Sequence, residues 1–177
     1  MTVGALTPSP ATALVLVVAL PPALEALRIR SIEDAAAGVP AHLTLLYPFA
    51  EERQLGDDVL EVVAAIAAIH PVLHLTLGEG RRFPETLYAS VEPDGPVRAL
   101  QADLGAAFPT LPLYGGRFGF EPHVSILEGP AAADPMALEN PAWRTLPVDQ
   151  LVDAIDLITG RDGRWATRRR FPLGTSG

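Results

Sequence analysis

The sequence contains no cysteine and no lysine, and each absence excludes a class of chemistry. Without cysteine the chain has no disulfide, no thiol nucleophile and no thiolate metal site. All 13 basic residues are arginine, and the net charge is −8. Such an acidic chain is a poor match for duplex DNA, because binding of long nucleic acid needs a broad basic surface. A small or terminal phosphate needs only a few arginines, so the charge favours that class of ligand.

The sequence also lacks a hydrophobic run long enough to cross a membrane. The apolar stretch at 11–20 is about half the length of a transmembrane helix. No basic residue precedes Arg28, so the stretch also lacks the positive region of a signal peptide. We therefore expect it to be a buried strand in a cytoplasmic protein. With 49% apolar and 19% charged residues, the chain should form one domain over 11–173, with tails at 1–10 and 174–177.

Hydrophobic patterning, proline and glycine predict strands that alternate with helices, as in an α+β or mixed α/β domain. We expect Asp57 or Asp58 to cap a helix, and glycine-rich residues 78–84 to connect two strands. Loops are expected at 31–40 and 111–119. The predicted strands cover 11–20, 41–47, 72–77, 86–91, 122–127, 148–159 and 164–172, and the predicted helices cover 22–30, 59–69, 96–107 and 131–140.

Two tetrapeptides, at 42–45 and 123–126, repeat the pattern histidine, apolar, hydroxyl, apolar. Alternate residues of a strand share a face, so His42 and Thr44 should point one way while the leucines between them pack on the other. His123 and Ser125 should behave in the same way. If the two halves are related by a pseudo-two-fold axis, two imidazoles and two hydroxyls meet in one cleft. Paired imidazoles suit general acid–base catalysis, and hydroxyls can donate to phosphate oxygens.

A third copy of the pattern, at 74–77, weakens the signal of the tetrapeptide alone. His74 lies inside a predicted strand rather than directly after a proline-bearing loop, and we expect it at the core or its edge. Most single histidines in strands are structural. His70 and His74 have the spacing of a helical metal pair, but Pro71 interrupts that helix. We therefore predict no metal site.

Residues 40–49 and 121–126 resemble the two motifs of the 2H phosphoesterase superfamily, in its 2′-5′ RNA ligase-like branch. Residues 80–84 with 87–88 resemble its inter-motif strand pair, and residues 163–173 resemble its closing strand. The resemblance covers about residues 11–173. It implies a bilobal, pseudo-two-fold α+β fold, with two antiparallel sheets flanking a central cleft and helices outside. It assigns catalysis to His42, Thr44, His123 and Ser125.

The resemblance implies a cyclic phosphodiesterase, and we expect it to need neither metal nor cofactor. Its substrate would be a nucleotide or RNA terminus with a 2′,3′-cyclic phosphate, opened to a phosphomonoester, and 2′-5′ RNA ligation would be the reverse reaction. Family analogy favours His123 as the base that activates water and His42 as the acid, giving a 2′-phosphate. A monomer is expected, because one chain completes the site. The alternatives are a non-catalytic module that binds nucleotides or RNA ends, and an unrelated protein with coincidental histidines.

Four further residues are candidates for substrate binding. Tyr47 and Phe83 could stack on a base, although aromatic side chains more often pack in the core. Arg81 and Arg82 could contact phosphate, although a solvated turn explains them equally well.

Overall fold

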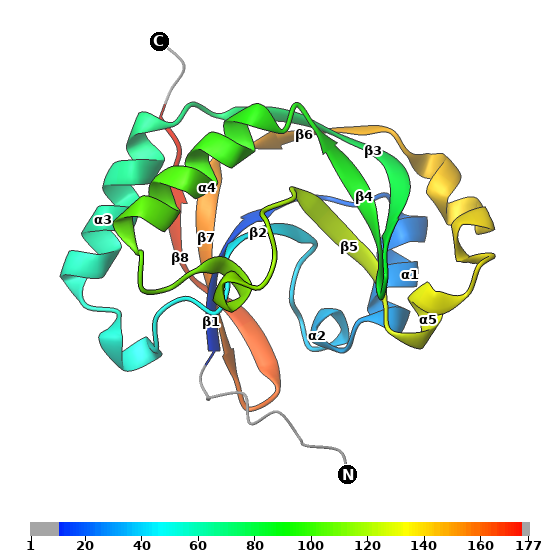
Figure 1. Ribbon diagram of the computed structural model, residues 1–177, viewed down its shortest axis with the longest axis horizontal. Coiled ribbons are helices and arrows are strands. Elements are labelled where there is room, and N and C mark those ends of the chain that lie inside the picture. Colours follow the sequence, from blue (N-terminus) through cyan, green and yellow to red (C-terminus); the bar gives the residue numbers. More distant parts are fainter. Residues whose placement is uncertain (1–10, 175–177) are drawn as a thin grey trace.

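The computed structural model describes residues 11–174, which form two sheets flanked by helices (Figure 1). The expected tail at 1–10 and residues 175–177 lie outside the described residues. The strands are β1 (Ala11–Val17), β2 (His42–Leu46), β3 (Leu73–Phe83), β4 (Thr86–Glu92), β5 (His123–Glu128), β6 (Val148–Val152), β7 (Ala154–Arg161) and β8 (Arg164–Pro172). The α-helices are α1 (Pro22–Ser31), α2 (Glu33–Ala36), α3 (Asp57–Ile69), α4 (Gly95–Ala107) and α5 (Pro130–Ala133). Short 3-10 helices cover Glu52–Gln54, Leu113–Gly116, Ala137–Glu139 and Pro141–Thr145.

The strands form two antiparallel four-stranded sheets, with the orders β2-β1-β7-β8 and β5-β4-β3-β6. The two motif strands, β2 and β5, each lie at one edge of their sheet. Residues of β2 and β5 contact one another, so these two edges meet near the middle of the molecule (Figure 1). This arrangement confirms the expected α+β fold with two antiparallel sheets.

Each sheet contains the same unit, in which a strand leads through a helix to the motif strand. The unit is β1–α1–β2 in the first sheet and β4–α4–β5 in the second. The helices are exchanged between the units: α1 packs against β5, and α4 packs against β2. Leu24 of α1 and Leu104 of α4 are fully buried. One continuous hydrophobic core therefore joins the two sheets, and each motif strand is supported by a helix from the other unit.

The motif strands show the predicted alternation of faces, followed in each by the same irregularity. Leu43 and Val124 are fully buried, whereas the histidines and hydroxyl residues beside them are half-buried. In β2 the pairing register with β1 shifts after Thr44, and in β5 the register with β4 shifts after Ser125. Such a bulge adds a residue to one strand and re-aims the side chains that follow. Two consecutive buried residues therefore come after each hydroxyl.

Two strand predictions were wrong. The connection expected at 78–84 is instead mostly strand, because β3 continues to Phe83. A Cβ at Gly80 would lie 2.7 Å from the indole of Trp143, so this glycine permits close packing rather than a turn. The single strand expected at 148–159 is divided at Asp153 into β6 and β7, which belong to different sheets.

The ends and connections of the helices also differ from expectation. The N-cap of α3 is Gly56, and Asp57 lies in the first turn instead. The loop at 31–40 contains α2, the loop at 111–119 contains a 3-10 helix, and the helix expected at 131–140 is two short turns. Gly174, expected in the C-terminal tail, donates its N–H to the carbonyl of His70 at 2.7 Å. No helix within residues 11–174 is long and apolar enough to span a membrane.

Candidate active site

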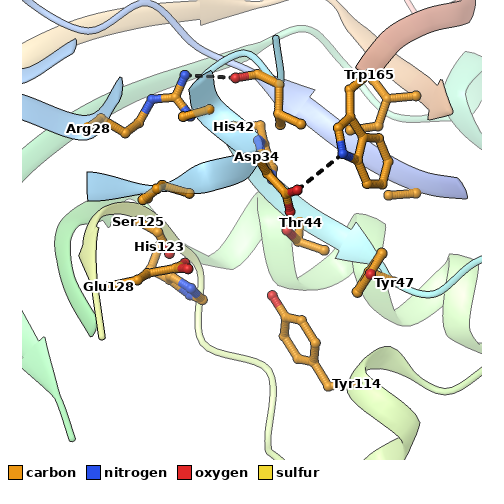
Figure 2. Close-up of a pocket in the computed structure, with 15 residues that line it drawn as sticks. Arg28, Asp34, His42, Thr44, Tyr47, Tyr114, His123, Ser125, Glu128 and Trp165 are labelled. Atoms are coloured by element: carbon orange, nitrogen blue, oxygen red, sulfur yellow. Dashed lines mark hydrogen bonds between the residues drawn. The ribbon is translucent and has the colours of Figure 1, made fainter. Parts of the chain in front are cut away.

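The two motif histidines lie on the wall of one pocket, together with Thr44 and Ser125 (Figure 2). The fold thus brings together all four residues of the predicted catalytic set. The reason is topological: β2 and β5 are edge strands that contact each other, and each carries its histidine at its first residue. We call this space the central pocket.

Both imidazoles are oriented by the same kind of hydrogen bond to a backbone carbonyl. Nδ1 of His42 is 2.7 Å from the carbonyl oxygen of Pro40, and Nδ1 of His123 is 2.6 Å from that of Glu121. A carbonyl oxygen only accepts hydrogen bonds, so Nδ1 is the protonated nitrogen in each ring. This leaves Nε2 of both rings as the nitrogen available to a ligand, in the tautomer that can accept a proton.

Burial lowers the pKa of both histidines below the usual value near 6.5. The carbonyl that accepts from each Nδ1 acts in the opposite direction. For His42, Arg28 and the second histidine lower the pKa further, whereas Asp34 raises it. For His123 the nearby charge is Glu121, which raises the pKa. Each imidazole therefore has a carboxylate of its own, and both rings are mainly neutral at pH 7.

The two hydroxyls have different partners. The hydroxyl of Thr44 lies beside the phenol of Tyr114 and lowers its pKa, against the larger effect of burial. The backbone N–H of Tyr114 donates to the carbonyl of Tyr47 at 2.7 Å. The hydroxyl of Ser125 lies beside the carboxylate of Glu128 and lowers its pKa, against the larger effect of burial. The hydroxyl of the repeated motif therefore lies beside an aromatic side chain in β2 and beside an acidic side chain in β5.

The rest of the pocket wall combines aromatic and charged side chains. Trp165 donates its indole N–H to Asp34 at 3.3 Å, and Tyr47 and Tyr114 lie on the same side (Figure 2). Arg28 also lines the pocket, but it is only 3% exposed. Its guanidinium donates to both carboxylate oxygens of Glu25, at 2.9 and 2.8 Å.

Of the four predicted substrate-binding residues, one lines the central pocket and three do not. Tyr47 lines the central pocket. Phe83 does not line it, but its ring packs edge-on against His123, with centroids 5.2 Å apart. Arg81 pairs with Glu79 at 3.2 Å, outside the pocket lining. Arg82 also lies outside the lining and donates to the carbonyls of Ala132 and, at 3.0 Å, Asp134, so it fixes the segment after α5.

The other histidines lie away from the pocket. His74 is exposed on β3, whereas we expected it at the core or its edge, because its neighbours Leu73 and Leu75 occupy the buried face. His70 is bound to Asp103 at 2.8 Å. No three histidine, aspartate or glutamate side chains among residues 11–174 gather closely enough to hold a metal ion.

Several pocket residues were not found by sequence reasoning: Arg28, Asp34, Tyr114, Glu128 and Trp165. Simple alternation would place Leu127, rather than Glu128, on the face of Ser125. The bulge reverses this assignment, and no feature of the sequence indicates the bulge. Trp165 belongs to β8, at the opposite edge of the first sheet from β2. Its position in the sequence gives no indication that it lies at the pocket.

A family model described as the 2′-5′ RNA ligase superfamily matches residues 17–164 of this chain. A search of curated proteins finds no match to the sequence. Among solved structures, E. coli LigT complexed with 3′-AMP superposes with a TM-score of 0.58 at 17% identity, covering 93% of this chain and 98% of LigT. TT0787 of Thermus thermophilus gives a TM-score of 0.57 at 18% identity, covering 94% of this chain and 100% of TT0787. E. coli LigT complexed with ATP gives 0.55 at 18% identity, covering 93% and 99%.

Proposed function

This chain belongs to the 2′-5′ RNA ligase superfamily, and we propose that it is a metal-independent phosphodiesterase that opens 2′,3′-cyclic phosphates. The substrate would be a nucleotide or an RNA end, and the product a phosphomonoester, with the phosphate on the 2′ oxygen. 2′-5′ RNA ligation would be the same chemistry in reverse. The observation that carries the proposal is the pair of imidazoles, each fixed through Nδ1 so that Nε2 is free in one pocket.

The proposed reaction uses one imidazole to remove a proton and the other to supply one. His123 accepts a proton from water as the water oxygen attacks phosphorus. The bond from phosphorus to the ribose 3′ oxygen then breaks, and His42 gives that oxygen a proton. Family analogy, not the nearby charges, gives this assignment, because Asp34 raises the pKa of His42 while Glu121 raises that of His123. At the end of the cycle the two histidines have exchanged protonation states, and solvent restores them.

Thr44 and Ser125 would hold the non-bridging phosphate oxygens. Both hydroxyls lie on the pocket wall beside the histidines. Donors aimed at an oxygen whose charge grows in the transition state lower the barrier more than they strengthen substrate binding. For this role each hydroxyl must direct its proton at the phosphate rather than at its neighbour, which is Tyr114 for Thr44 and Glu128 for Ser125.

A nucleoside ligand is supported by the aromatic side of the pocket. Tyr47, Tyr114 and Trp165 offer surfaces on which a base can stack. The similar structure of E. coli LigT has been solved with 3′-AMP and with ATP, which is consistent with a nucleotide ligand here.

The test is hydrolysis of 2′,3′-cyclic nucleotides and of short RNAs with cyclic ends by chelator-treated protein. His42→Ala and His123→Ala should abolish turnover, whereas His74→Ala should leave it unchanged. His74 is a matched control, because it has the same tetrapeptide context but lies on an exposed strand face. Identifying the product isomer then shows which ribose oxygen leaves.

The same assay separates the enzyme from a binding module. Nucleotide binding that depends on His42 and His123, without turnover on any of these substrates, would support the binding module instead. Turnover that disappears with the chelator and returns with added metal would contradict the metal-independent mechanism.

A further inference from the structure

The central pocket has an excess of negative charge, although its proposed ligand is a phosphate. Asp34 and Glu128 both line the pocket beside the motif residues (Figure 2). Arg28 is the one arginine in that lining, and Glu25 neutralises it through two hydrogen bonds. Both imidazoles are mainly neutral at pH 7, so they do not offset the two carboxylates.

These carboxylates also affect the pKa of other groups of the pocket. Burial raises the pKa of Tyr47, and Asp34 raises it further. Burial also raises the pKa of Tyr114, and Glu128 adds to this effect. Partial desolvation at the pocket wall raises the pKa of Glu128, whose side chain is otherwise exposed, and Asp34 raises it further. Asp34 thus acts on Glu128, and the two acids act on different tyrosines of the pocket.

We infer that Asp34 and Glu128 select ligands by charge, accepting the singly charged cyclic diester and expelling the doubly charged monoester into which it is converted. This inference rests on the proposed function. A phosphodiester carries one negative charge, whereas a phosphomonoester carries nearly two at pH 7 and above, because its second pKa is about 6. Repulsion grows in proportion to the charge of the ligand, so the carboxylates weaken product binding more than substrate binding. Glu128 is thereby a specificity-determining residue.

Glu128 is the better residue to test, because it is not among the charges that shift either histidine. Asp34 acts on His42 and Glu121 acts on His123, so changing either acid also changes a catalytic pKa. Glu128→Gln removes one charge while keeping an oxygen that can accept from Ser125. Glu128→Asp keeps the charge. Glu61→Gln, at an exposed position of α3, is the control for the same change in net charge.

The measurements are the inhibition constant of adenosine 2′-monophosphate and the KM for 2′,3′-cyclic AMP at pH 8. For Glu128→Gln we expect the monophosphate to bind about tenfold more tightly. The monoanionic substrate should feel half the change in free energy and gain about threefold, so the ratio of the two constants falls about threefold. Glu128→Asp and Glu61→Gln should keep the wild-type ratio.

An unchanged ratio in Glu128→Gln, or weaker binding of the monophosphate, would overturn the inference. Calorimetric dissociation constants for the same two nucleotides give the ratio without catalysis. Absence of turnover would therefore refute the proposed function alone, whereas tighter binding of the monophosphate by Glu128→Gln would still support selection by charge.

Discussion

The two motif strands have the same backbone but different surroundings. In both β2 and β5, a histidine bonds through Nδ1 to the carbonyl two residues before it, and the register shifts just after the hydroxyl residue. Yet His42 lies near Arg28 and Asp34, whereas His123 lies against the rings of Phe83 and Tyr88. The repeat thus fixes where the imidazoles are, and side chains from elsewhere in the chain make them chemically different.

The position five residues after each histidine shows this most clearly. It is Tyr47 in the first motif and Glu128 in the second, and both line the central pocket because the bulge aims them there. One side of the pocket is therefore suited to stacking on a base, and the other repels charge. Although the two motif strands are equivalent, the pocket between them can therefore bind a ligand whose two ends differ.

The largest expected effect comes from removing the imidazoles, and it tests whether the two strands contribute as one unit. His42→Ala and His123→Ala should each reduce kcat/KM for a cyclic nucleotide by about 10²–10⁴-fold. The double variant should lose little more than the worse single variant, because acid and base act in the same step. Losses that multiply would indicate two independent roles. Circular dichroism of each variant checks that the fold is retained.

The buried faces of the two strands provide the next comparison. Leu43 and Val124 occupy equivalent positions and are both 0% exposed. Leu43→Ala should lower the free energy of unfolding by about 2–5 kcal/mol, because it leaves a cavity in the core. Val124→Ala removes one carbon fewer and should cost about 0.8 kcal/mol less. Urea denaturation measures both, and a larger loss for Val124→Ala would show that the second unit is the more tightly packed.

The features that could be predicted from the sequence are those set by local pattern. Alternation placed His42 with Thr44 and His123 with Ser125, and the prolines before them marked where the strands begin. The buried leucines and valines between these residues also followed from alternation. The meeting of the two motifs depended on symmetry between the halves, which the repeated pattern suggested and the contact between β2 and β5 supports.

The features that could not be predicted depend on contacts distant in the sequence. A glycine such as Gly80 has the same local sequence pattern whether it forms a turn or lets a strand pass close to another side chain, here that of Trp143. Glu128 reaches the pocket only because of a bulge in pairing with β4. Arg82 resembles a free cation in the sequence, but the backbone carbonyls of Ala132 in α5 and of Asp134 just after it accept its N–H groups.

A smaller effect is expected from the hydroxyls, and it compares their two partners. Thr44→Val and Ser125→Ala should each reduce kcat by about a hundredfold, because each removes one donor to the phosphate. Thr44→Ser should restore most of the activity, since it keeps the hydroxyl. Single-turnover rates with saturating substrate measure this directly. Loss of substrate affinity at constant kcat would show that the hydroxyls bind the ground state instead.

The smallest expected effect concerns pH and compares the pKa values of the two histidines. Burial lowers the pKa of both histidines. The base works only when neutral and the acid only when protonated, so kcat/KM should follow a bell-shaped profile with its maximum below about pH 6.5. A maximum well above pH 7 would contradict these directions. The profile of kcat should lie at higher pH, because a bound phosphate favours the protonated imidazole.

Asp34→Asn and Glu121→Gln should each change the pKa of one histidine. Removing Asp34 lowers the pKa of His42, and removing Glu121 lowers the pKa of His123, since each acid stabilises the protonated ring. If His42 is the acid, Asp34→Asn should shift the alkaline limb of kcat/KM to lower pH by less than about one unit. Glu121→Gln should instead shift the acidic limb to lower pH, because His123 as the base then stays neutral in more acidic solution. The opposite pattern would show that His123 has the higher pKa of the two, because the alkaline limb follows the group with the higher pKa. The two histidines have equivalent backbone positions but different neighbouring carboxylates. Single substitutions of these acids therefore show which limb of the pH profile belongs to which histidine.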